Sequence, residues 1–199
     1  MAPIAIEGTI GSGKSTLLDA IERTTLLKVR REPVDAWVPW LTRAYRHRDS
    51  HFQLQTRIML DTCTHLPDAD IVERSPALQP YTFIPAMIGD GGIREEDADL
   101  LAELHRNMLT WRPQMTIFLR CSFPECLRRI KERRRKCEKD LDVSYLERLH
   151  NLYERTVERF PDILVIDTTE MTPDEVADAC LEIVIAIKRD VIAMAHIVD

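Results

Sequence analysis

The sequence predicts an α/β fold of the doubly wound type, in which helices cover both faces of a five-stranded parallel sheet. Two observations support this prediction. Short, β-like apolar runs alternate along the chain with longer runs of helical period, a pattern typical of βαβ units. The 199 residues, 45% of them apolar, can also form one sizeable core, so we expect a single domain over residues 1–199.

The individual elements follow from these apolar runs. Residues 3–7, PIAIE, are typical of a buried strand, and residues 14–23 of a helix with Leu17, Leu18 and Ile21 on one face. A second strand is expected to end at Glu32, and further core strands are expected at 68–73, 114–121 and 162–167. The remaining helices are expected at 36–47, 52–65, 95–110, 123–135, 143–159 and 173–195.

The composition argues against several classes of protein. A formal charge of −6 disfavours a nucleic-acid partner, because binding phosphates broadly requires a basic face. The N-terminal residues show no targeting pattern and no uncharged apolar run reaches membrane-spanning length, so we expect a soluble, cytoplasmic protein without a membrane partner. The five cysteines form no CxxC pair, which predicts reduced thiols and neither a disulfide framework nor a zinc site.

A phosphate-binding loop lies between the first strand and the first helix. Gly8, Gly13, Lys14 and Ser15 satisfy the P-loop pattern GxxxxGK[ST] in the strand-to-helix context that it requires. A plain glycine-rich turn would explain the glycines but not Lys14 and Ser15 at this spacing. In a P-loop, backbone N–H groups surround phosphate oxygens, the lysine neutralises the β/γ charge and the serine can ligate Mg²⁺. The expected nucleotide-binding residues are Gly8, Thr9, Ile10, Gly11, Ser12, Gly13, Lys14, Ser15 and Thr16.

A P-loop alone does not separate GTPases, ATP-driven motors and small-molecule kinases. The chain has no NKxD segment to read guanine, which argues against a GTPase. After the first helix comes REPVDAW, residues 31–37, which places the carboxylate of Glu32 at the edge of the sheet where ligands bind in such folds. A base at that position could meet a substrate hydroxyl.

Three segments together resemble the deoxyribonucleoside kinase family, whose members phosphorylate thymidine, deoxycytidine or deoxyguanosine. They are the EPVxxW segment at 32–37, the acidic-Arg-Ser segment ERSPALQPYTF at 73–83, and the arginine-rich run RRIKERRRK at 128–136. The resemblance covers residues 4 to about 167 and places an Arg-rich lid at about 129–141. It implies an ATP- and Mg²⁺-dependent 5′-kinase that acts on a deoxyribonucleoside.

The resemblance also implies roles for the central side chains. Glu32 matches the base that accepts the 5′-hydroxyl proton, and Arg74 matches the residue that holds Glu32 or the 5′ oxygen. Glu73 would lie near the metal, with Ser15, or near the transferred group. Taken singly, Glu32 could be an exposed strand-end charge, and Glu73 and Arg74 an ordinary salt bridge at the end of a strand. The catalytic set expected from the resemblance is Lys14, Glu32, Arg74 and Arg129.

The substrate-binding set follows from the same comparison. Tyr45 and Glu138 match the residues that hold the sugar 3′-hydroxyl. Gln55 matches the glutamine that pairs with the edge of the nucleobase. An amide suits this pairing because it can both donate and accept a hydrogen bond. Gln53 fits a solvated helix face. The rest of the expected substrate set is Trp37, Ile58, Gln79 and Phe83, beside Glu32 and Arg74.

Planar guanidinium groups that clamp phosphoryl oxygens are expected in the lid. By resemblance these are Arg129, Arg133 and Arg135, the last two counted with the nucleotide-binding residues. In isolation the basic run would fit a solvated helix face. Two positions depart from the family pattern, since Cys137 replaces an acidic residue and Asp142 a proline.

Base preference and assembly are the least specified features. Relatives that accept deoxycytidine and purines pair an arginine with an aspartate, and Thr62 and Gln79 occupy the matching positions, so a thymidine-like or broad pyrimidine preference is expected. Gln79 could instead lie on a solvated turn. The alternatives are a thymidylate-like monophosphate kinase, which Glu32 disfavours because it would repel an anionic acceptor, and a nucleotide-binding regulatory module. The family implies a homodimer formed through helices, with residues 100–109 as candidates.

Overall fold

The computed structural model describes residues 2–135 and 141–195 and contains one parallel sheet. Its strands are β1 (Ile4–Glu7), β2 (Val29–Arg30), β3 (Ile71–Glu73), β4 (Met115–Arg120) and β5 (Leu164–Asp167). Their order across the sheet is β2-β3-β1-β4-β5, and every neighbouring pair is parallel. The predicted α/β class and five-stranded parallel sheet are confirmed. All five carboxyl ends therefore lie at one edge, with β1 and its following loop at the centre.

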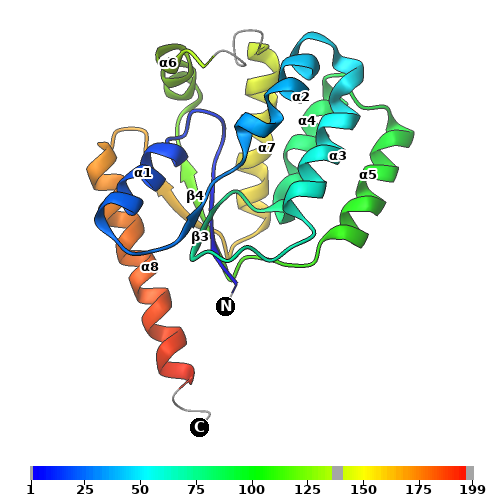
Figure 1. The fold of residues 1–199 in the computed structure, drawn as a ribbon. Coiled ribbons are helices and arrows are strands. Elements are labelled where there is room, and N and C mark those ends of the chain that lie inside the picture. Colours follow the sequence, from blue (N-terminus) through cyan, green and yellow to red (C-terminus); the bar gives the residue numbers. More distant parts are fainter. Residues whose placement is uncertain (1, 136–140, 196–199) are drawn as a thin grey trace.

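Helices cover both faces of this sheet (Figure 1). The face formed with α1 and α8 is seen on the left, and α3, α4, α5 and α7 lie on the other side. The helices are α1 (Lys14–Thr24), α2 (Val34–Arg46), α3 (His51–Thr62), α4 (Phe83–Gly89), α5 (Glu95–Met108), α6 (Phe123–Arg133), α7 (Val143–Arg159) and α8 (Pro173–Ala195), with short 3-10 turns η1 (Arg48–Ser50) and η2 (Pro76–Tyr81).

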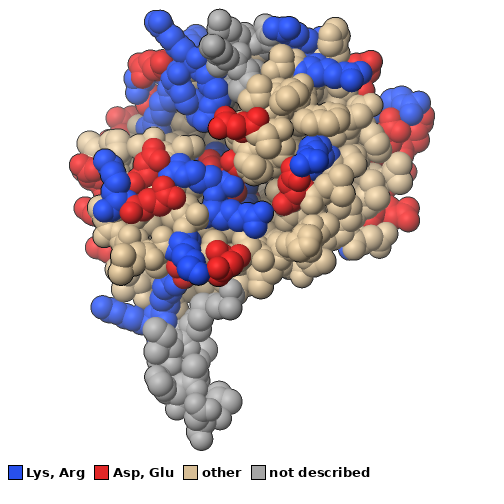
Figure 2. All heavy atoms as spheres, viewed as in Figure 1, with Lys and Arg blue, Asp and Glu red and all other residues tan. Residues whose placement is uncertain are grey.

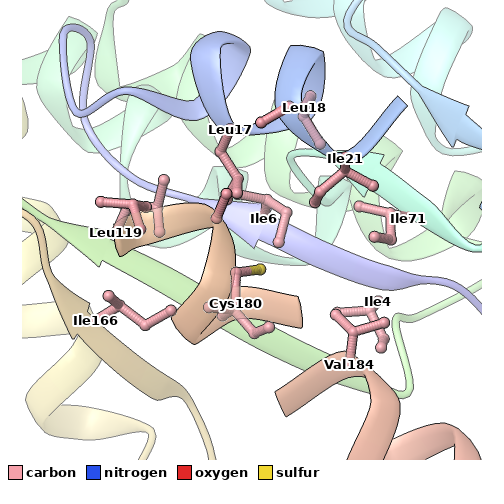
Figure 3. Packing of buried hydrophobic residues seen from close by; sticks show 14 residues of the cluster. Ile4, Ile6, Leu17, Leu18, Ile21, Ile71, Leu119, Ile166, Cys180 and Val184 are labelled. Atoms are coloured by element: carbon pink, nitrogen blue, oxygen red, sulfur yellow. The ribbon is translucent and has the colours of Figure 1, made fainter. Parts of the chain in front are cut away.

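The core between the sheet and the α1/α8 layer fixes the start of α1. Figure 3 shows Ile6 of β1 beside Leu17 and Ile21 of α1, and Ile4 of β1 next to Val184 of α8, and all five side chains are buried. Burial of an aliphatic side chain of this size stabilises the fold by about 1.5–3 kcal/mol. The helix that follows the phosphate loop is thus held firmly against the central strand.

Two local differences from the sequence expectation have physical reasons. The strand β2 ends at Arg30, two residues before Glu32, because Glu32 precedes Pro33 and α2 begins at Val34. The helix α4 was not expected. It has only seven residues, too few for a clear helical period, and Pro85 lies in its first turn, where the missing N–H is tolerated.

The cysteines and the helix lengths can be compared with the expectations from composition. Cys63, Cys121, Cys126 and Cys180 are free and buried, whereas Cys137 lies outside the described residues. Within residues 2–135 and 141–195, no helix combines the length and the apolar character that crossing a bilayer requires.

The phosphate loop depends on a glycine with no room for a side chain. Gly11 has φ +90°, and a Cβ there would lie 2.6 Å from the carbonyl oxygen of Cys126. We expect Gly11→Ala to lower the free energy of unfolding by about 2–4 kcal/mol, from backbone strain plus overpacking. Gly91, with φ +72° and nothing within 4 Å, is the control for strain alone, and Gly91→Ala should lose about 1–2 kcal/mol. If urea unfolding showed equal losses of free energy in Gly11→Ala and Gly91→Ala, the clash at Gly11 would be contradicted.

Candidate active site

A cavity of about 800 Å³ opens at the carboxyl edge of the sheet. Its walls come from the loop after β1, the ends of β2 and β3, and helices α2, α3 and α4. Each residue expected to contact substrate lines it, except Glu138, which lies outside the described residues. Of the expected nucleotide-binding residues, only Gly8, Thr9 and Ser12 are not part of its lining. The structure therefore brings segments that are far apart in the sequence to one place.

The P-loop wraps around the side chain of Lys14. Gly8, Gly11 and Gly13 all have positive φ angles, which the tight turn requires. The Lys14 Nζ donates to the carbonyl oxygens of Gly8 at 2.9 Å and Thr9 at 2.8 Å. Burial, together with repulsion from the Arg74 guanidinium, lowers the pKa of Lys14 to about 7. An anion bound in the loop would restore its charge.

A carboxylate and a guanidinium are paired in the wall of the cavity. The Arg74 Nε donates to the Glu32 Oε2 at 3.0 Å, and neither side chain is more than one fifth exposed. Burial raises the pKa of Glu32 above its ordinary value, although Arg74 acts in the opposite direction. A carboxylate with a raised pKa is a better proton acceptor than an exposed one at the same position. This pair can therefore orient and deprotonate a hydroxyl group.

The two expected metal ligands lie in contact. The Ser15 hydroxyl donates to the Glu73 Oε1 at 3.2 Å, where the start of α1 meets the end of β3. Mg²⁺ prefers oxygen ligands and is often held by one or two protein groups plus substrate phosphates. A hydroxyl and a carboxylate beside a phosphate loop fit this donor set.

The wall of the cavity also carries neutral polar groups. Gln55 is buried on α3, its Nε2 donates to the Met87 Sδ at 3.3 Å, and its Oε1 has no donor within the described part of the chain. Gln53 is exposed and does not line the cavity. The Trp37 Nε1 donates to the Asp61 Oδ2 at 2.7 Å, which fixes the buried indole in the wall.

Gln79 and Thr62, the two positions singled out for base preference, touch each other. The Thr62 hydroxyl donates to the Ile58 carbonyl at 2.8 Å, so its oxygen must accept the bond from the Gln79 Nε2 at 3.3 Å. Gln79 is only 8% exposed, which rules out the solvated turn considered as an alternative. The pair contributes no charge to the site.

The deoxynucleoside kinase family model matches residues 4–189. The chain belongs to this family. Its activity is therefore that of an ATP-dependent deoxyribonucleoside kinase. The mitochondrial thymidine kinase 2 of Homo sapiens is 32% identical over 168 residues, which are 76% of this chain and 62% of that protein. The deoxyadenosine kinase of Dictyostelium discoideum is 29% identical over 86% of this chain and 74% of its own length.

A solved structure of deoxyadenosine kinase from M. mycoides, with products dCMP and a flexible dCDP bound, has the same fold. Its TM-score is 0.83 at 22% identity, covering 93% of this chain and 99% of that one. The relatives differ in the nucleoside for which they are named, so they leave the base preference of this kinase open.

The basic run of this kinase, 128–136, forms the second half of α6 and continues past its end, and residues 136–140 of the expected lid lie outside the described residues. Figure 2 shows Lys and Arg side chains gathered over α6 at the upper left. The Arg129 Nη2 donates to the Thr168 carbonyl at 3.0 Å and its Nη1 to the Ser12 carbonyl at 3.5 Å, so its guanidinium lies at the rim of the P-loop. Arg133 and Arg135 line the cavity. A second hollow of about 780 Å³ adjoins the P-loop between α6 and the residues after β5.

Two buried residues of the kinase site were not found from the sequence. Glu7 ends β1 directly before the P-loop, and Tyr153 lies on α7. Both line the main cavity, and the Tyr153 hydroxyl donates to the Glu7 Oε2 at 3.2 Å. A carboxylate that closes an otherwise apolar strand was a signal for Glu7. Tyr153 gave none, because an aromatic residue on the inner face of a long helix is usually core.

Proposed function

We propose that this kinase transfers the γ-phosphoryl group of ATP to the 5′-hydroxyl of a pyrimidine deoxyribonucleoside, with thymidine as the first candidate. The observation that carries the proposal is the half-buried, hydrogen-bonded pair of Glu32 and Arg74, which lines the same cavity as the P-loop and Gln55. A carboxylate at this position suits a neutral hydroxyl acceptor. It would repel the phosphate of a nucleoside monophosphate.

In the proposed mechanism the residues mainly place the reactants. The P-loop and Lys14 hold the β- and γ-phosphates, while Glu32 accepts the 5′-hydroxyl proton as the oxygen attacks in line. Arg74 and Arg129 neutralise charge on the transferred group. Mg²⁺, when bound, supplies charge neutralisation at the phosphates, and Ser15 and Glu73 would hold it. The hollow beside α6 offers space for the base of the donor nucleotide.

The preference for a pyrimidine rests on the neutral side chains of Gln55, Gln79 and Thr62. Gln55 can pair with the N3–H and an adjacent carbonyl of thymine, because a primary amide both accepts and donates. The hydrogen-bonded pair of Thr62 and Gln79 adds no charged group that would favour a particular exocyclic substituent. The Gln79 Oε1 has no donor within the described residues, so deoxycytidine, whose amino group has two hydrogens, belongs to the proposed range.

Transfer of labelled γ-phosphate from ATP to each of the four deoxyribonucleosides, and to thymidine monophosphate, tests the proposal. We expect thymidine to be phosphorylated, with pyrimidines favoured over purines by kcat/KM. Transfer only to the monophosphate would overturn the assignment of the acceptor. A strong purine preference would overturn the assignment of the base and leave the chemistry intact.

Gln55 and Gln53 offer a matched pair of variants on one helix. Replacing the buried Gln55 by Leu should raise KM for the preferred nucleoside by about 10- to 100-fold, since a lost base contact is worth about 1–3 kcal/mol. Gln53→Leu, on the exposed face of α3, should leave KM within about twofold. Steady-state kinetics with the nucleoside varied make the comparison. Similar changes in both variants would show that Gln55 does not read the base.

We also propose that the kinase is a homodimer. Within the candidate segment 100–109, Leu101 is fully buried in the chain's own core, whereas Leu100 is 46% exposed. Only part of this segment is therefore available to a second copy. Sedimentation equilibrium should give twice the mass of one chain, and a single-chain mass at micromolar concentration would contradict it.

A further inference from the structure

The protein holds two of the three nitrogen atoms of the Arg74 guanidinium. Its Nε donates to Glu32, and its Nη1 donates to the Gly8 carbonyl at 2.9 Å and to the Tyr153 hydroxyl oxygen at 2.5 Å. These contacts use three of the five N–H groups that arginine offers. The Nη2 donates to no acceptor within the described residues, and Arg74 lines the cavity. The free edge of the guanidinium is thus available to a ligand.

The direction of the hydrogen bonds makes Tyr153 a link between Arg74 and Glu7. A phenol has one proton, and the Tyr153 hydroxyl donates it to the Glu7 Oε2, so the same oxygen must accept from Arg74. The Glu7 Oε2 lies 3.8 Å from the Arg74 Nη1, close enough to balance its charge. Burial raises the pKa of Tyr153, which keeps the phenol protonated and the chain of bonds in this direction.

Glu7 also holds the backbone from which Arg74 projects. Its Oε1 accepts the backbone N–H of Ser75 at 2.7 Å, and the Arg74 N–H donates to the Ile6 carbonyl at 3.0 Å. Arg74 has φ +64°, a left-handed conformation that a residue with a long side chain adopts only when its surroundings impose it. One carboxylate therefore fixes both the turn and, through Tyr153, the tip of the side chain.

The ring of Tyr153 is itself fixed. It stacks on Phe118 with centroids 5.7 Å apart and meets Phe83 edge-on at 6.1 Å, and Phe83 lies beneath the Arg74 guanidinium at 4.8 Å. The tyrosine is 1% exposed. Its hydroxyl cannot move away from Arg74 without moving α7, so it is a rigid reference point in the wall of the site.

We propose that Tyr153 and Glu7 are positioning residues that aim the free edge of the Arg74 guanidinium at the transferred phosphoryl group. This rests on the proposed function of the site as a 5′-kinase. The two residues do not touch the reacting atoms. They act by removing the alternative orientations of Arg74, so their effect belongs to the chemical step and not to ATP binding.

Tyr153→Phe is the test, because it removes the hydroxyl and keeps the aromatic packing. We expect kcat to fall about 10- to 100-fold, while the Kd for ATP stays within about twofold. Tyr145→Phe is the control, since Tyr145 is also a buried tyrosine on α7 but does not line the cavity. The kcat of this variant should equal that of wild type. An unchanged kcat in Tyr153→Phe would overturn the proposal.

A double-mutant cycle with Arg74 separates a positioning role of Tyr153 from a general loss of stability. In an Arg74→Lys background, Tyr153→Phe should leave the residual kcat unaltered, because the tyrosine acts only through the arginine. A further drop of the same size in that background would refute action through Arg74. The Nε–H resonance of Arg74, identified by its loss in Arg74→Lys, should exchange with solvent faster in Tyr153→Phe.

The exchange rate of the Arg74 Nε–H can be measured whether or not the enzyme turns over. If wild type phosphorylates no nucleoside and the exchange of Arg74 still speeds up, the proposed function fails while the positioning contact stands. If wild type is active and neither kcat nor exchange responds to Tyr153→Phe, the positioning role fails and the proposed function stands.

Discussion

Glu32→Gln is expected to lower kcat by about 10²- to 10⁴-fold and to leave the Kd for ATP within about twofold. The glutamine keeps the size of the side chain and can accept the bond from the Arg74 Nε, but it cannot take a proton from the 5′-hydroxyl. Because Glu32 acts on the acceptor, binding of the donor should not respond. Single-turnover transfer and equilibrium ATP binding separate the two effects.

The pH dependence gives an independent check on Glu32. Since the base must be ionised, wild-type kcat/KM should fall as the pH decreases through the Glu32 pKa. Burial raises this pKa, so the acid limb should lie at higher pH than an exposed glutamate would give. The Glu32→Gln variant should lack that limb. Glu95→Gln, at an exposed position on α5, is the control and should retain wild-type kcat and pH profile.

Wild-type turnover in the Glu32→Gln variant would remove Glu32 from the proposed mechanism. In that case the buried Glu7 would be the next carboxylate to test, since it also lines the cavity. A base at Glu7 would also change the meaning of the Tyr153→Phe result. The tyrosine, which donates to Glu7, would then take part in proton transfer and not only in positioning Arg74.

The parts of the fold and site that the sequence predicts are those encoded locally. The P-loop could be recognised because its glycines, Lys14 and Ser15 are contiguous and stand between a strand and a helix. Gln55 could be separated from Gln53 because the helical period places Leu54 and Ile58 on the inner side of the helix. The sheet followed from apolar runs, because buried parallel strands need them.

What the sequence did not predict depends on contacts between distant segments. Tyr153 lies 146 positions after Glu7, and their hydrogen bond exists only because α7 packs in the same core as Phe118 of β4. The left-handed conformation of Arg74 has no local signal either, since it is imposed by Glu7 and the Ile6 carbonyl. The short helix α4 has too few residues for its period to be read.

Lys14→Ala should weaken both ATP binding and transfer. Removing one charged hydrogen-bond donor to phosphate is worth about 1.5–3 kcal/mol, so we expect the Kd for ATP to rise about 10- to 100-fold. The kcat should fall by about 10²- to 10³-fold, since the lysine also neutralises charge that develops on the phosphates. Lys28→Ala is the control, because Lys28 is exposed and its ammonium pairs with Asp68, and neither residue lines the cavity.

The lowered pKa of Lys14 predicts that ATP affinity decreases as the pH rises above 7. Burial and the charge of Arg74 bring this pKa to about 7, and a bound phosphate favours the protonated form. Above pH 7, ATP must therefore bind together with a proton, and affinity should fall by up to about tenfold per pH unit between 7 and 9. Calorimetry in buffers of different ionisation enthalpy would detect the proton. Wild type should take it up and Lys14→Ala should not, whereas the same pH dependence in both would mean that another group is responsible.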